Sequence, residues 1–206
     1  MNIWGTIKVE LDSKKTDSNY EIVFCNWPGK DRSDRGICFV PADLSAVAKV
    51  REYIEKIAAE FHLSEQNIFE LALVADELVA NAILASYAKT GAENIVLKWA
   101  FKDNLFTITV LDYGGGFKIN EIFEEVPRGA DLPSFLKSLK EYRNARKVEV
   151  PLNGKLIDHL RFGRGLRIIS NLVSKLEIEF HNEDGRMVSE PDSKTVGSII
   201  TVQYAA

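Results

Sequence analysis

Glu77 and Asn81, which stand four residues apart in the first half of the chain, have side chains that could take part in catalysis or metal binding. On an α-helix this spacing stacks them one turn apart, so a carboxylate and a carboxamide oxygen point into the same space. A carboxamide oxygen is a hard ligand that suits Mg²⁺, and the carboxylate could orient or deprotonate a hydroxyl group. Taken alone, such a pair more often bonds only backbone or water, so the interpretation needs support from elsewhere in the chain.

Two glycine-rich segments give that support. The first follows Asp112, where Gly114 and Gly116 belong to the run YGGGF. Successive glycines mark backbone that adopts unusual dihedral angles or approaches something closely, although a flexible hairpin turn fits this run equally well. The second segment, RFGRGL, precedes apolar residues at helical spacing, so a Gly-x-Gly loop opens a helix. Free N–H groups at a helix start and nearby arginines suit a phosphate; the residues concerned are Arg161, Gly163, Arg164, Gly165 and Leu166.

The helix that must carry the first pair is predicted over residues 67–87, which contain no Gly or Pro and are rich in Leu and Ala. Ser64 is expected to cap it. Apolar side chains cover most of its circumference and leave a thin polar line of Glu70, Glu77 and Asn81. A helix that is apolar almost all round is buried, and a buried carboxylate is costly unless something pairs with it. We therefore expect another part of the chain or a ligand to lie against Glu77 and Asn81.

The remaining elements follow from apolar periodicity and turn signals. A preceding helix is expected to open at Pro41 or Asp43. In the strand that ends at Asp112, the alternate residues Phe106, Ile108 and Val110 are apolar, and Asp112 follows them on the same face. Strands are predicted over 3–11, 20–25, 37–40, 94–101, 104–111, on both sides of an Asn153-Gly154 turn, and over 176–182 and 195–204.

The composition narrows the class of protein. With 206 residues, 46% of them hydrophobic, the chain supports one core, so one domain with an elaboration is expected. The net charge of -4 and the lack of a recognition-helix motif argue against nucleic acid as a partner. Cys25 and Cys38 lack metal-binding spacing, which favours reduced thiols in a cytoplasmic protein. No apolar run reaches the ~20 residues of a membrane span.

In their order along the chain, these segments resemble the GHKL ATPase superfamily, and within it most closely the bacterial anti-sigma-factor serine/threonine kinases. ELVANAILAS is similar to the Asn box of that branch, LDYGGGF to its first glycine box and GRGLRIISNLV to its second. Gly197 and Ser198 stand where these kinases carry a Gly-Thr pair, and Ala85 stands where they often carry His. The resemblance covers residues 39–204.

The resemblance implies a role for each part of the site. Asn81 would bind the Mg²⁺ that bridges the ATP phosphates, and Glu77 would act as general base or orient the attacking hydroxyl. Asp112 would accept a hydrogen bond from the adenine amino group, which favours adenine over guanine. Gly114 and Gly116 would let the backbone approach the nucleotide, and the turn at 161–166 would hold the phosphates.

The implied fold is an α/β (α+β) two-layer sandwich, in which helices cover one face of a mixed, mainly antiparallel sheet. Residues 1–38 would form an N-terminal β elaboration and residues 39–206 the ATPase domain. Residues 117–162 would form a long lid that closes over ATP.

The function expected from the resemblance is ATP-dependent phosphorylation of a serine or threonine on an antagonist (STAS-type) protein, in a partner-switching system that also includes a sigma factor. Homodimerisation is left open. The alternative is a nucleotide-gated interaction module, in which ATP orders the lid and the lid binds a partner without phosphorylating it. The catalytic half of a sensor histidine kinase is set aside, because His62, His159 and His181 lack the context of a phosphoacceptor in a dimerisation helix.

Overall fold

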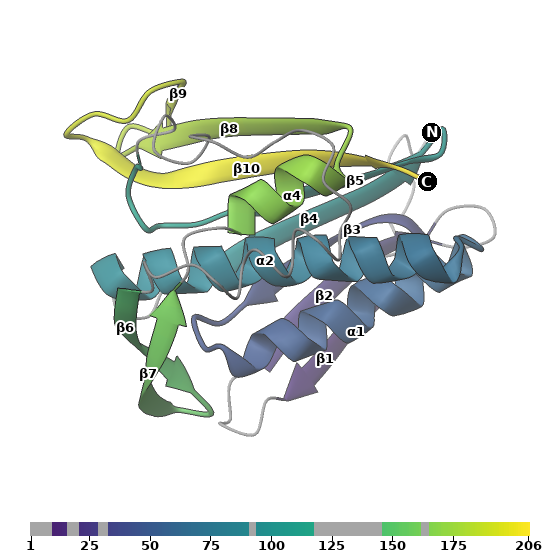
Figure 1. Cartoon of the computed structure of the whole chain (residues 1–206), viewed down its shortest axis with the longest axis horizontal. Helices are drawn as coiled ribbons and strands as arrows, with labels where there is room; N and C mark the ends of the chain where they lie inside the picture. The colour runs from purple at the N-terminus through teal and green to yellow at the C-terminus, as the bar shows by residue number, and fades with distance from the viewer. Residues whose placement is uncertain (1–9, 16–20, 29–32, 91–93, 118–145, 162–164) are drawn as a thin grey trace, which may run out of the picture.

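The computed structural model describes residues 10–15, 21–28, 33–90, 94–117, 146–161 and 165–206. The helices are α1 (Ser45–Glu60), α2 (Glu65–Thr90) and α4 (Gly165–Leu172). The strands are β1 (Glu10–Lys15), β2 (Glu21–Pro28), β3 (Ser33–Val40), β4 (Ile95–Lys102), β5 (Leu105–Leu111), β6 (Arg146–Leu152), β7 (Lys155–Arg161), β8 (Lys175–Asn182), β9 (Met187–Val188) and β10 (Thr195–Ala205). Helices α1, α2 and α4 lie on one face of the large sheet (Figure 1), so the predicted two-layer α+β sandwich is confirmed.

The large sheet has eight strands in the order β1-β2-β3-β4-β5-β10-β8-β9. Every strand pairing that the structure describes in it is antiparallel, whereas the prediction allowed a mixed sheet. β4 and β5 reverse direction at Asp103 and Asn104, which both adopt the positive φ of a tight hairpin turn. The order places β10 between β5 and β8, so residues at the end of β5 lie beside β10.

The N-terminal strands extend further than the turn signals predicted. β1 runs through Lys15 into the polar run DSKK, because these residues pair with β2, as in Lys14 with Ile22. β3 begins at Ser33 and not at Ile37, because its first half pairs with both β2 and β4. Local turn propensity is overridden here by cross-strand pairing.

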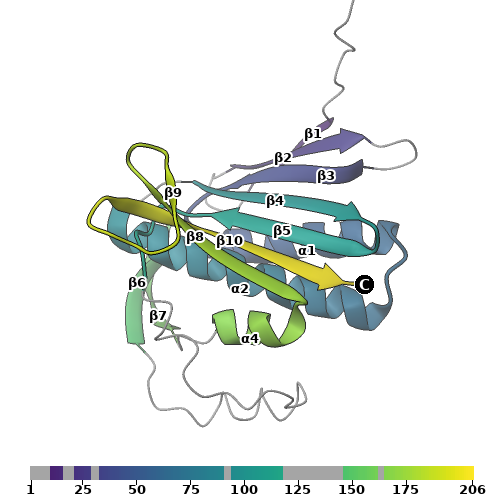
Figure 2. The same cartoon turned by 90° about the horizontal axis from the view of Figure 1, so that it is seen from above.

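The core lies between the sheet and the helices. Trp99 and Phe106 of the central strands are fully buried, and so are Phe24 and Cys38 of the N-terminal strands. The N-terminal strands therefore share one core with the rest of the sheet (Figure 2). α2 is buried on several sides, since it contacts α1, α4 and β6 as well as the sheet. No helix in the described part of the chain is long and apolar enough to cross a membrane.

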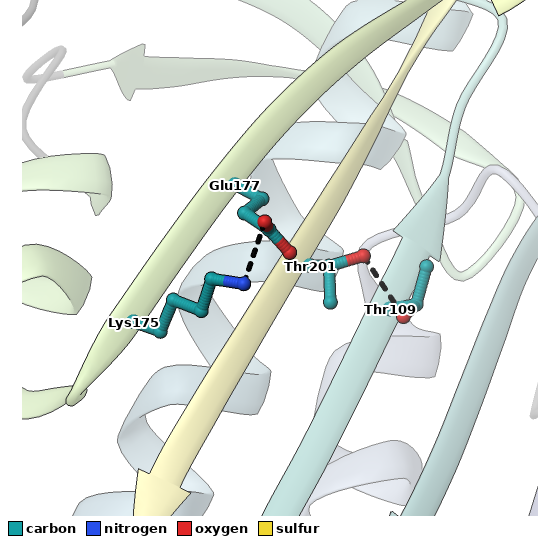
Figure 3. Close-up of polar contacts among 4 residues, drawn as sticks. All are labelled: Thr109, Lys175, Glu177 and Thr201. Atoms are coloured by element: carbon teal, nitrogen blue, oxygen red, sulfur yellow. Dashed lines mark hydrogen bonds and ion pairs between the residues drawn. The ribbon is translucent and has the colours of Figure 1, made fainter.

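The opposite face of the sheet carries polar side chains over β5, β10 and β8. Thr109 and Thr201 share a hydrogen bond of 3.0 Å between their hydroxyls, and Lys175 Nζ lies 2.7 Å from Glu177 Oε1 (Figure 3). Glu177 and Lys175 are about half exposed. This part of that face therefore lies towards solvent.

At the start of each long helix a side-chain oxygen accepts a hydrogen bond from a main-chain N–H group. Asn67 N donates to Ser64 Oγ at 3.2 Å, which confirms the predicted cap of α2. Ser45 N donates to Asp43 Oδ1 at 2.8 Å at the start of α1. The second Asp43 oxygen accepts from Gly154 N at 2.8 Å, so this carboxylate also joins α1 to another element.

That element is the β6–β7 hairpin, which turns at Asn153 and Gly154 as predicted, both with positive φ. Asn153 N also donates to Asp43 Oδ1 at 3.0 Å, and Val150 is fully buried in the core. The hairpin thus packs against the body of the protein at the end of α2 (Figure 1). Residues 118–145, the other part of the predicted lid, lie outside the described residues.

Candidate functional site

One side of α2 organises the candidate site. Glu77, Asn81, Ala85 and Lys89 follow one another at four-residue intervals, so they form a broad strip that runs ~18 Å along the helix and turns about 120° around it. We call these four residues the α2 site face. Gly114 and Gly115 of the first glycine segment and Gly165 of the second, which are far apart in the sequence, lie against it.

The start of α4 lies directly on the first two residues of this face. A Cβ added at Gly165 would come closer than 3.0 Å to both Glu77 Oε2 and Asn81 Nδ2. Leu166 is only 9% exposed and belongs to the core, which fixes the first turn of α4 in this position. The main chain at Gly165 is therefore the part of the chain that lies against Glu77 and Asn81, which are both half-buried.

Burial raises the pKa of Glu77, and the neighbouring charge of Asp76 raises it further. Burial also raises the pKa of Asp76 from 3.8 to about 6; the charge of Arg51 opposes this rise and that of Glu55 adds to it. Arg51 Nε lies 3.2 Å from Asp76 Oδ2. A carboxylate whose pKa is raised towards neutrality is a better proton acceptor for a hydroxyl group, which suits Glu77 to general base chemistry.

Asn81 has an unused polar group. Its Nδ2 is buried and finds no hydrogen-bond partner within the part of the chain that the structure describes. Because the oxygen and nitrogen of a carboxamide exchange places by rotation, Asn81 could equally present its oxygen there. Mg²⁺ in nucleotide sites takes one or two protein oxygens and completes its shell with phosphate oxygens and water. Asn81 therefore fits a nucleotide-bound Mg²⁺; in the described residues no cluster of three or more His, Cys, Asp or Glu could hold an ion alone.

Asp112 directly follows β5, is 4% exposed and is held by several donors. Its Oδ1 accepts from Gly114 N at 2.8 Å and from Ser198 N at 3.4 Å, and its Oδ2 accepts from the Ser198 hydroxyl. Burial raises the pKa of Asp112, while the hydrogen bonds from Ser198 and Gly114 and the charge of His181 oppose the rise. A carboxylate oxygen has about two acceptor sites, so Oδ2 keeps capacity for a further donor such as an amino group.

The first glycine segment is folded closely onto α2. A Cβ at Gly114 would come closer than 3.0 Å to the backbone of Ala85, and one at Gly115 would meet Lys89 Nζ at 2.8 Å. Tyr113 N donates to Ser86 Oγ at 2.9 Å, and Gly115 N donates to Val196 O at 2.8 Å. These contacts argue against a flexible hairpin turn. Gly116 is exposed and faces Pro191.

The structure thus brings most of the predicted site residues to one side of α2. Glu77, Asn81 and Gly165 are neighbours, and Gly114 lies one helical turn further along with Asp112 beside it. Arg161 ends β7 and only its backbone is described; Gly163 and Arg164 lie outside the described residues.

Sequence reasoning missed three contributors, namely Ser86, Lys89 and His181. Lys89 Nζ donates to Thr195 O at 3.3 Å. The sequence signal for Lys89 was its position, because it continues the four-residue spacing of Glu77 and Asn81. His181 contacts Asp112 across an intervening strand, which no local pattern reveals.

A family model described as the histidine kinase-like ATPase domain matches residues 40–189, more than half of the chain. The matched range begins at the last residue of β3 and contains the α2 site face and both glycine segments. No curated protein matches the chain.

Proposed function

The chain belongs to the histidine kinase-like ATPase domain family of the GHKL superfamily, and from that premise we propose that it is an ATP-dependent serine/threonine protein kinase of anti-sigma-factor type. Membership in this family supports ATP binding by the chain. The kinase activity, the magnesium ion and the protein partner are the proposal.

The observation that carries the proposal is the contact of Gly165 with Glu77 and Asn81. Phosphoryl transfer needs mainly positioning and neutralisation of charge. N–H groups at the start of α4 would bind phosphate oxygens beside the pair, in line with the anion preference of helix N-termini. Glu77 would accept the proton of an attacking hydroxyl, and its raised pKa suits that role.

Asn81 would hold the Mg²⁺ ion, which neutralises charge on the phosphates when bound. The support is the Asn81 Nδ2 atom, which is buried and finds no partner among the described residues, and which lies close to Gly165 together with Glu77 Oε2.

Asp112 would select the base. Its remaining acceptor capacity suits the exocyclic amino group of adenine, whereas guanine presents a carbonyl oxygen at the same place. A site that is built to bond one hydrogen-bonding group rejects an analogue that lacks it. We therefore propose that ATP is preferred over GTP.

The phosphate acceptor would be a serine or threonine of an antagonist (STAS-type) protein, with a sigma factor as a further partner and a homodimer as the assembly. The support is the likeness of ELVANAILAS, LDYGGGF and GRGLRIISNLV to the boxes of the anti-sigma kinases. The net charge of -4 gives no support for nucleic acid as a partner.

Glu77→Gln tests the kinase activity. With Mg-ATP and a candidate STAS-domain partner, the variant is expected to lose at least ~100-fold in transfer of labelled phosphate and to keep its ATP affinity. Glu65→Gln, at the exposed start of the same helix, is the matched control and should transfer as the wild type does.

The second candidate is a nucleotide-gated interaction module. The docked β6–β7 hairpin favours it, because it carries Leu156, which is 57% exposed, on the segment between the two glycine boxes. If the wild type binds ATP and the partner but transfers no label, the kinase assignment fails and the module remains.

A further inference from the structure

We propose that His181 is a positioning residue of the nucleotide site, which fixes the main chain that carries Asp112 and thereby sets the preference for adenine. This inference rests on the proposed role of Asp112. It concerns a histidine on β8, a strand that is separated from β5 by β10 in the sheet order.

The imidazole reaches Asp112 across β10. His181 is paired with Gly197 of β10, and His181 Nε2 lies 2.9 Å from the Asp112 main-chain oxygen. A Cβ at position 197 would come closer than 3.0 Å to both atoms of this contact. Only glycine leaves the imidazole a path over the strand, and the register of β10 against β8 shifts between Thr195 and Gly197 at this point.

The contact requires a hydrogen on one particular nitrogen of the imidazole. A carbonyl oxygen can only accept, so the hydrogen must be on Nε2 and the imidazole must donate. The Tyr113 ring lies edge-on to the imidazole, with 5.4 Å between the ring centroids. His181 therefore contacts both residues joined by the peptide bond that follows Asp112.

Asp112 is consequently held at two places by two different strands. Ser198 of β10 binds its carboxylate, and His181 of β8 binds its carbonyl. The peptide between Asp112 and Tyr113 is bonded at both of its polar atoms, since Tyr113 N donates to Ser86 Oγ and His181 holds the Asp112 oxygen. Loss of His181 leaves the oxygen without this donor. Without the donor of His181, the carboxylate would be less well directed at the base, whereas contacts to the phosphates at Gly165 would be unaffected.

The test compares the affinities of His181→Phe and His181→Gln for ATP and GTP. The Phe variant keeps a ring beside Tyr113 but has no donor, so ATP affinity is expected to fall about tenfold and GTP affinity to change much less. The Gln variant keeps a donor on a shorter side chain and should recover a good part of the loss. Glu179→Gln, an exposed residue two positions before His181 on the same face of the strand, is the control. If ATP and GTP affinities fall equally in the Phe variant, or if neither falls, the inference is overturned.

A measurement on the wild-type protein does not depend on the folding of a variant. Nitrogen NMR of the imidazoles should show His181 with a hydrogen on Nε2, and a neutral ring protonated only on Nδ1 would contradict the proposal. The outcomes also separate two failures. If the wild type does not distinguish ATP from GTP, or if Asp112→Asn leaves that preference intact, the proposed role of Asp112 fails. If Asp112→Asn abolishes the preference and His181→Phe leaves it unchanged, only the role of His181 fails.

Discussion

Gly165 shows how a single missing side chain can define a site. The atoms that an added Cβ would meet are the ends of the Glu77 and Asn81 side chains and not backbone. Side-chain ends can turn away at small cost, so this glycine is required for the arrangement of the pair more than for the stability of the fold.

We therefore expect Gly165→Ala to lower ATP affinity at least tenfold while the free energy of unfolding changes by less than ~1 kcal/mol, since alanine also favours the helix by about that amount. Titration calorimetry and urea denaturation measure the two quantities. Gly185→Asn is the matched control, because position 185 has open space and asparagine tolerates its positive φ. A stable Gly165→Ala variant with full ATP affinity would show that the pair is not part of the site.

Asp76 gives a second prediction at this scale. Its pKa is raised from 3.8 to about 6, chiefly by burial, so the folded chain binds this proton more tightly than the unfolded chain does. The contribution of Asp76 to the free energy of unfolding must then fall as the pH rises from 3.8 through about 6. Asp76→Asn removes this titration, so the variant should gain stability relative to the wild type over that range.

Urea denaturation at a series of pH values measures the difference between the two proteins. Glu55→Gln removes one charge that raises the pKa of Asp76, so it should weaken the trend without abolishing it. A difference between Asp76→Asn and the wild type that does not vary with pH would refute the prediction.

Among the elements, the β6–β7 hairpin depends on one buried carboxylate. Asp43 is 1% exposed and accepts hydrogen bonds from three backbone N–H groups, those of Ser45, Asn153 and Gly154. Burial would raise the pKa of Asp43, but these bonds and the Ser45 hydroxyl outweigh it and hold the pKa below its ordinary value. The start of α1 and the turn of the hairpin are thereby stabilised together.

Asp43→Ala should destabilise the protein by about 1–3 kcal/mol, because buried donors lose their acceptor. It should also speed hydrogen exchange at Asn153 and Gly154 more than at the centre of β4. Asp34→Ala is the control, since Asp34 is exposed and its contact with Arg35 is 3.8 Å, a pair worth little. Unchanged exchange at the hairpin turn in Asp43→Ala would mean that other contacts hold the hairpin.

At the scale of the whole molecule, the sequence predicted what local periodicity and backbone freedom determine. The long apolar helix, its Ser64 cap, the Asn153-Gly154 turn and the two-layer fold are all confirmed. Each depends on residues close together in the chain or on a single pattern of burial.

The features that the sequence did not predict depend on strand order and long-range packing. β1 continues through a polar run because β2 pairs with it, and His181 meets Asp112 only because β10 lies between their strands with a glycine at the crossing. The docking of the hairpin on Asp43 joins residues 110 and 111 positions apart. No local propensity encodes contacts of this kind.

We propose that one side of α2 brings the two glycine segments together around a magnesium-bound adenine nucleotide. The most direct test is the affinity for ATP and GTP, with and without Mg²⁺, of the wild type, Asn81→Ala and Asp112→Asn. We expect the wild type to prefer Mg-ATP, Asn81→Ala to lose the effect of Mg²⁺, and Asp112→Asn to lose the preference for adenine. If both variants keep the magnesium effect and the base preference of the wild type, the nucleotide is bound elsewhere and the proposed site is wrong.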